Sequence, residues 1–178
     1  MKRYVSIMAA VVAVGLTVTL TGCSSGGRGY ATPTKTCGIP VKKDALLPLL
    51  PDGENVGEES AGSVTSDRGC DVIVDERVVL SVYEAYVDKL YDPMADLESY
   101  KFKHRKPIQR LPFAGKGAVG HTNAMISTKC GGPKVKYLLV DIDVDKAVNS
   151  DVKQRRKDME RFVEAYVPNA QKKLKCTA

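Results

Sequence analysis

The stretches Lys134–Val144, KVKYLLVDIDV, and Val152–Val167, VKQRRKDMERFVEAYV, decide the fold. From Leu138 to Val144 every second residue is aliphatic, so these side chains share one face of a strand. In the second stretch apolar residues recur at the helical spacing, which predicts an amphipathic helix that begins at residue 149 or 150. Pro168 is expected to end or kink this helix. A strand with one apolar face, followed by a helix with one apolar stripe, predicts a sheet that the helix covers on one side.

Two candidate hairpins lie upstream of the helix. Residues 70–74 and 78–87 are rich in β-branched side chains and are separated by a turn at 75–77; residues 118–130 and 134–144 are separated by Gly131-Gly132-Pro133. Short helices are expected at 41–50 and 92–100, with irregular structure at 51–66 and 101–117. The sequence therefore predicts an α+β domain, in which an antiparallel sheet of about four strands packs against a C-terminal amphipathic helix.

The N-terminus has the three zones of a secretory signal. Lys2 and Arg3 precede an apolar run from Val5 to Leu20, which is short for a membrane-spanning helix. The run ends in Leu20-Thr21-Gly22-Cys23, which resembles the lipobox of bacterial lipoproteins. The resemblance implies that residues 1–22 are removed as a signal peptide and that the thiol of Cys23 carries a diacylglyceryl group. The alternatives are an uncleaved anchor helix and ordinary cleavage into the medium.

The expected organisation follows from this leader. Residues 23–36 are rich in Gly, Ser and Thr and are expected to form a flexible tether. Residues 37–178 are long enough for one domain with a real core. We therefore expect a lipid-anchored protein on the extracytoplasmic face of the cell membrane.

Four further cysteines are expected to form two disulfides, because exported domains are commonly stabilised in this way. They allow three connectivities, of which Cys37–Cys70 with Cys130–Cys176 is favoured because each bridge ties a terminus to a predicted strand. No Cys-x-x-Cys pair indicates a redox or zinc site. The segments Cys37-Gly38-Ile39, Leu46–Leu50 and Cys70-Asp71-Val72, with late cysteines at 130 and 176, resemble the small lipoproteins of unknown function in actinobacteria. That resemblance supports the fold and the location and implies no activity.

Composition narrows the classes of partner. Loss of Lys2 and Arg3 with the signal lowers the net charge from +6 to +4, which suits a protein near anionic lipid or cell-wall polymer. The absence of tryptophan and the presence of only three phenylalanines weigh against a surface that stacks sugars or bases. Nucleic acid is not an expected partner outside the cell.

Several patterns resemble functional motifs without meeting their requirements. Residues 115–120 match G-x-G-x-x-G but lack the following helix that binds phosphate, so a flexible loop is expected. Asp141, Asp143 and Asp145 lack the glycine and glutamate that complete a calcium loop, so a solvated strand face is expected. His104 and His121 are far apart in sequence and have no partner at metal spacing. We expect no catalytic residue, cofactor or metal.

The strongest candidate for binding is a basic cluster formed by Lys101, Lys103, His104, Arg105, Lys106 and Arg110. Near a bilayer, each lysine or arginine contributes about 1 kcal/mol of attraction to anionic lipid. The leading hypothesis is a non-catalytic envelope module that binds anionic lipid, a cell-wall polymer or an envelope protein through this cluster. The alternative is a carrier of a small ligand, with a pocket between the sheet and the C-terminal helix.

Overall fold

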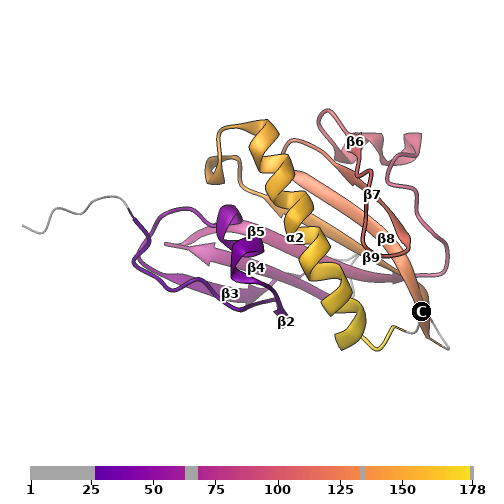
Figure 1. Ribbon diagram of the computed structural model, residues 1–178, viewed down its shortest axis with the longest axis horizontal. Helices are drawn as coiled ribbons and strands as arrows, with labels where there is room; N and C mark the ends of the chain where they lie inside the picture. Colours follow the sequence, from indigo (N-terminus) through magenta and orange to yellow (C-terminus); the bar gives the residue numbers. More distant parts are fainter. Residues whose placement is uncertain (1–26, 63–67, 133–134, 177–178) are drawn as a thin grey trace, which may run out of the picture.

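The computed structural model describes residues 27–62, 68–132 and 135–176. They form one seven-stranded antiparallel sheet with the order β3-β4-β5-β9-β8-β7-β6, and a long helix, α2, crosses one face of it (Figure 1). The strands are β3 (Val56–Ser60), β4 (Arg68–Val74), β5 (Arg77–Val87), β6 (Lys106–Pro107), β7 (Gly115–Val119), β8 (Asn123–Gly132) and β9 (Val135–Val144). The predicted α+β class is confirmed, while the sheet is larger than the four strands expected.

Both predicted hairpins are present and form the centre of the sheet. β4 and β5 are joined through Asp75 and Glu76, whose φ angles of 46° and 67° give a two-residue turn that matches the twist of the strands. β8 pairs with β9, and β9 pairs antiparallel with β5, so the two hairpins join edge to edge. The three remaining strands widen this core on both sides.

The strands that the sequence analysis missed lie toward the edges. β3 falls in the segment 51–66 that was predicted to be loop, and its side chains are exposed apart from that of Val56. Edge strands carry such polar sequences, which hide their periodicity. β7 contains most of the G-x-G-x-x-G segment, so the expectation of a flexible loop there is wrong. Its glycines allow close packing, because a Cβ at Gly117 would lie 3.0 Å from the side chain of Ile108.

Helix α2 (Val152–Lys173) covers the inner face of the sheet. Asp151 caps its N-terminus by accepting hydrogen bonds from the backbone N–H groups of Lys153 and Gln154. The apolar stripe is completely buried: Met159, Phe162, Val163, Tyr166, Val167 and Ala170. The helix continues through Pro168, so the expected end at that residue is wrong. Burial of Val167 and Ala170 on either side outweighs the one hydrogen bond that proline removes.

The N-terminal part of the described chain packs on the inner face of the sheet, beside α2 (Figure 1). It contains a two-stranded sheet, β1 (Lys35–Thr36) with β2 (Ile39–Pro40), then α1 (Lys43–Leu46) and the 3-10 helix η1 (Leu47–Leu49). The structure differs here from the expected tether, because the guanidinium of Arg28 donates to the carbonyl of Leu50 at 2.6 Å and the hydroxyl of Tyr30 donates to that of Pro51. These polar contacts to the backbone carry no periodicity that a sequence could show.

Two disulfides fasten both ends of the domain to the sheet. Cys37 is bonded to Cys70 at the start of β4, and Cys130 in β8 is bonded to Cys176 after α2. The favoured connectivity is confirmed. Cys23 and the signal segment lie outside the described residues, so lipid attachment stays a prediction. Within the described residues, none of the helices combines the length and the apolar character needed to cross a membrane.

The outer face of the sheet is covered by a smaller layer. After β5 the chain returns through the 3-10 helix η2 (Asp96–Lys101), which replaces the helix expected at 92–100. Phe102 then packs with Ala118, Met125 and Leu139 in a second apolar cluster. Because side chains alternate along a strand, Leu139 lies on the face opposite Leu138 and Val140 of the main core. A further 3-10 helix, η3 (Lys146–Val148), leads from β9 into α2.

Candidate functional site

The six residues of the predicted basic cluster fall into two groups. Lys103, His104, Lys106 and Arg110 are exposed. Lys101 pairs with Glu98 at 3.1 Å, and the guanidinium of Arg105 donates to the carbonyls of Pro93 and Ala95 at 2.9 and 2.7 Å. Lys101 and Arg105 therefore hold their own segment together, and the exposed members remain for a partner.

The structure brings together two histidines that the sequence analysis left unrelated. The rings of His104 and His121 stack with their centroids 4.6 Å apart, and the N–H of His121 donates to the carbonyl of Lys103 at 3.1 Å. Lys106 lies two residues farther on, opposite Val119 at the end of β7. We call Lys103, His104, Lys106 and His121 the basic surface. Arg110 lies outside it, because the chain after β6 runs antiparallel to β7 and away from His121.

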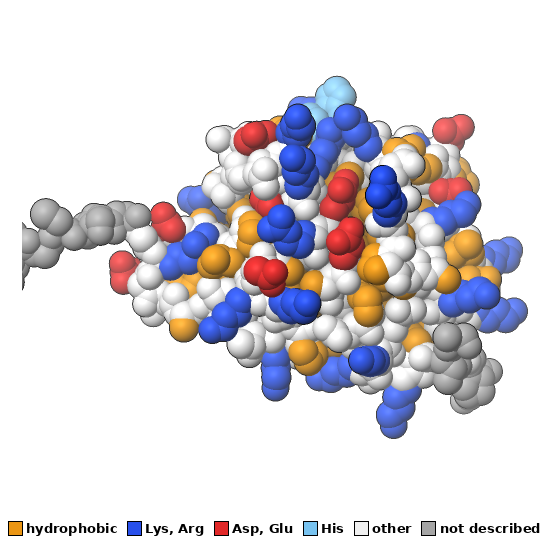
Figure 2. Space-filling model, in the orientation of Figure 1, with side chains coloured by type: hydrophobic (Ala, Val, Ile, Leu, Met, Phe, Trp, Pro, Cys, Tyr) orange, Lys and Arg blue, Asp and Glu red, His pale blue; other side chains and the backbone are white. Residues whose placement is uncertain are grey.

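Two arginines of the first turns of α2 position the basic surface. Arg155 is buried and donates to the carbonyl of His121 at 2.7 Å, and also to those of Lys146 and Asn149. Arg156 donates to the carbonyls of Gly120 and His104. The helix therefore holds both histidine loops in place, and Figure 2 shows the histidines at the top of the molecule among Lys and Arg side chains. No local motif could have indicated this arrangement.

The electrostatics of the basic surface favour an anion. Partial loss of hydration lowers the pKa of His121, and the positive fields of His104, Arg156 and Lys103 lower it further. A bound anion would remove part of this repulsion and provide an acceptor for the imidazole and ammonium groups. Among the described residues, His, Cys, Asp and Glu side chains form no group of three that could hold a metal ion.

Asp141 and Asp143 of β9 and Asp145, directly after it, have separate roles, which corrects the expectation of one solvated face. Asp145 caps η3 by accepting a hydrogen bond from the N–H of Ala147 at 2.8 Å, and Asp143 is exposed. Asp141 is half-buried, and the loss of hydration raises its pKa to about 6 despite the positive charge of Lys101. Above pH 6 Asp141 is therefore ionised in a partly buried position, which lowers the free energy of unfolding.

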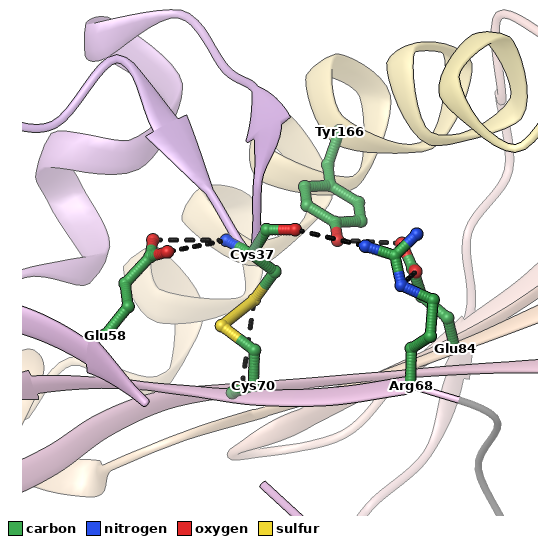
Figure 3. The surroundings of a disulfide bond; sticks show 6 residues. All are labelled: Cys37, Glu58, Arg68, Cys70, Glu84 and Tyr166. Atoms are coloured by element: carbon green, nitrogen blue, oxygen red, sulfur yellow. Dashed lines mark hydrogen bonds and ion pairs between the residues drawn. A yellow bond between two sulfur atoms is a disulfide. The ribbon is translucent and has the colours of Figure 1, made fainter. Parts of the chain in front are cut away.

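A buried polar chain links α2 to the sheet, and the sequence analysis did not find it (Figure 3). The hydroxyl of Tyr166 donates to the carboxylate of Glu84 at 2.8 Å, and Arg68 lies 3.5 Å from the same carboxylate. Burial and the negative charge of Glu84 raise the pKa of Tyr166, so the phenol stays protonated and remains a donor. The sequence held one indication of it. Glu84 continues the alternation of Leu80 and Val82 on the inward face of β5, and a carboxylate at such a position requires a buried partner.

The polar chain continues to the first disulfide. Arg68 also reaches the carbonyl of Cys37 at 3.5 Å, and the carboxylate of Glu58 accepts from the N–H of Cys37 at 3.1 and 3.2 Å. Figure 3 shows these groups around the Cys37–Cys70 bond. A surface hollow of about 550 Å³ lies beside it, lined by Glu58, Arg68 and their neighbours. The contacts join the N-terminal turn, β3, β4 and α2 and thus act structurally.

The interface between α2 and the sheet is closely packed. The alternative function placed a ligand pocket here, but Met159, Phe162, Val163 and Val167 fill the space and are fully buried. The hollows that involve described residues include the one at Cys37–Cys70 and others on the outside of α1 and α2 and along β3 and β4. The packing therefore gives the carrier hypothesis no support.

Replacing Tyr166 by phenylalanine tests the buried polar chain. Tyr166→Phe removes the hydroxyl that donates to Glu84 and leaves a buried carboxylate one donor short, so the free energy of unfolding should fall by about 1–3 kcal/mol. Tyr100→Phe, at an exposed position, is the matched control and should change it by less than about 0.5 kcal/mol. Urea denaturation at pH 7 measures both variants. Equal stability of the Tyr166→Phe protein and the parent would show that Arg68 alone satisfies Glu84.

Asp141 should make stability depend on pH. Between pH 4 and pH 6 the folded chain keeps a proton on Asp141 that the unfolded chain releases, so the parent loses stability as the pH rises through this range. Asp141→Asn abolishes this loss and should stabilise the protein by about 1–2 kcal/mol above pH 7, after allowance for solvent screening. The gain should vanish toward pH 4 in thermal unfolding followed across the range. A gain that is the same at every pH would contradict this assignment.

Comparisons with known proteins add no constraint. No protein-family model, curated protein or solved structure matches the chain. The features of the described residues that bear on function are the two disulfides and the basic surface held by two arginines of α2.

Proposed function

We propose that this chain is a lipid-anchored protein of the extracytoplasmic face of the cell membrane, and that it acts without catalysis by binding an anionic partner through its basic surface. The single observation that carries the binding role is the placement of the basic surface. Lys103, His104 and His121 lie on two loops that Arg155 and Arg156 fix to α2, and Lys106 lies in the adjoining strand β6. A rigid scaffold that presents cationic donors is suited to recognition of charge.

Two features support the proposed location. The Leu20-Thr21-Gly22-Cys23 sequence follows a signal-like segment, and Cys37, Cys70, Cys130 and Cys176 are all paired, which suits an oxidising compartment. Because the chain contacts the domain from Arg28 onward, only five residue steps separate Cys23 from the first contact. Fully extended, these steps span about 17 Å. A lipid on Cys23 would therefore hold the domain close to the bilayer.

The surroundings of the histidines favour binding over catalysis. The groups described around His104 and His121 are cations and backbone carbonyls, whereas a catalytic imidazole is usually oriented by a carboxylate. Anionic lipid, an anionic cell-wall polymer and an acidic envelope protein all offer oxygen acceptors that match the basic surface. Nucleic acid is not an expected partner at the proposed location.

Neutralising two exposed lysines tests this proposal. The double variant Lys103→Gln, Lys106→Gln should bind phosphatidylglycerol vesicles or a soluble phosphodiester polymer about 10–30-fold more weakly, since each lysine contributes about 1 kcal/mol near an anionic surface. Arg105 is left unchanged because it holds residues 93–95. Lys42→Gln, Lys43→Gln makes the same change of charge on exposed residues of another part of the domain.

The comparison should be made by co-sedimentation for vesicles and by titration calorimetry for the polymer, at low and at physiological salt. Equal binding of the two double variants would show that affinity comes from net charge alone and would contradict a specific basic surface. Unchanged circular dichroism of both variants is the control for folding.

A further inference from the structure

Exposed apolar side chains are concentrated in one segment of the described chain. Seven large hydrophobic residues of the described chain are exposed, and five of them lie between residues 90 and 100. Two stand out, because Leu97 is 84% and Tyr100 is 81% exposed. Single exposed apolar residues are common on protein surfaces, but a cluster of them marks an interaction site.

The short helix that carries these residues has its polarity inverted. In η2 the carboxylate of Glu98 is buried and pairs with Lys101 at 3.1 Å, while Leu97 and Tyr100 are exposed. In a 3-10 helix, residues three apart lie on the same side, so Leu97 and Tyr100 project together. An amphipathic helix that only covered a sheet would turn these two residues inward. We call Met94, Leu97 and Tyr100 the apolar tip.

The apolar tip is held firmly against the sheet. Besides the bonds from Arg105 to residues 93 and 95, the N–H of Tyr91 donates to the Ser127 hydroxyl at 3.1 Å, and Lys116 pairs with Asp92 at 2.5 Å. Phe102, directly after η2, is buried in the outer cluster. The exposure of the tip is thus a property of a fixed conformation.

Charges around the tip select the kind of partner. The basic surface begins three residues after Tyr100. On the other side of the segment, Lys89 is exposed beside the equally exposed Asp88. Two of the nearby carboxylates, Asp92 and Glu98, are already paired with lysines. An apolar tip with an aromatic residue, next to exposed lysines, is the combination found where proteins enter the interface of an anionic bilayer.

We propose that the apolar tip inserts Leu97 and Tyr100 into the interfacial layer of an anionic membrane, beside the basic surface. This inference deepens the proposed function by naming its partner as lipid. Asp96 is exposed next to Leu97 and limits insertion to the depth of the headgroups.

The tip and the proposed anchor lie at opposite edges of the sheet. Arg28, near the proposed anchor, pairs with Gly53, which lies just before β3 at one edge of the sheet. Lys106, which follows the tip in the chain, lies in β6 at the other edge. Six strand spacings separate these edges, about 29 Å. Two attachments at this separation would hold the domain to the bilayer at both edges of its sheet.

The absence of tryptophan in the chain provides a clean test. Leu97→Trp and Tyr100→Trp each create the sole tryptophan at an exposed position of the tip. Glu164→Trp, exposed on α2 on the other side of the sheet, is the matched control. The mature chain, carrying whatever lipid its cells attach, is placed in phosphatidylglycerol vesicles with lipids brominated near the headgroup. Emission from positions 97 and 100 should move to shorter wavelength and be quenched, while emission from 164 should not.

Three results would overturn the proposal. Unquenched emission at both 97 and 100 would show that the tip stays in water. Equal quenching at 164 would show unspecific adsorption, and a concentration-dependent shift without vesicles would show that a second copy covers the tip. The outcome is separable from that of the proposed function, because the lysine variants report on the basic surface, and the mass of the chain reports on the anchor.

Discussion

The packing of α2 against the inner face of the sheet is the constraint on which the other parts of the structure depend. Its buried stripe closes the main core, and Tyr166 satisfies the only carboxylate that β5 turns into it, that of Glu84. At its N-terminal end, Arg155 and Arg156 hold the loops of His104 and His121; at its C-terminal end, the Cys130–Cys176 disulfide ties the chain to β8. Displacing the helix would therefore expose the core and release the two loops that carry the basic surface.

The sequence predicted the parts of the fold that rest on periodicity. The alternation from Leu138 to Val144 and the helical stripe from Val152 to Val167 define β9 and α2, and both hairpins and the disulfide pairing agree with the structure. Strand β3 was missed because its sequence is polar, β6 because it has only two residues, and β7 because it is rich in glycine. The packing of Arg28 and Tyr30 was missed because it consists of hydrogen bonds to backbone carbonyls.

The candidate site could be predicted only as a segment. Charge density singled out residues 101–110, but it could not show that Lys101 and Arg105 are used internally or that His121 stacks on His104. Those facts depend on pairings between residues far apart in the chain. The apolar tip was not predicted either, because apolar residues in an expected helix suggest a buried face. In the structure Leu97 and Tyr100 are exposed, while Glu98 is buried and pairs with Lys101.

The proposed protein is a rigid domain that meets an anionic membrane through a lipid at one edge of its sheet and through apolar and basic side chains at the other. The location of this domain and its distance from the bilayer both depend on the lipid anchor on Cys23. Intact-mass spectrometry of the protein released from its native membranes can detect that anchor. We expect a chain that begins at Cys23, carries the mass of a diacylglyceryl group and lacks the four hydrogens of two disulfides. A chain that retains residues 1–22, or one cleaved without lipid, would contradict this expectation.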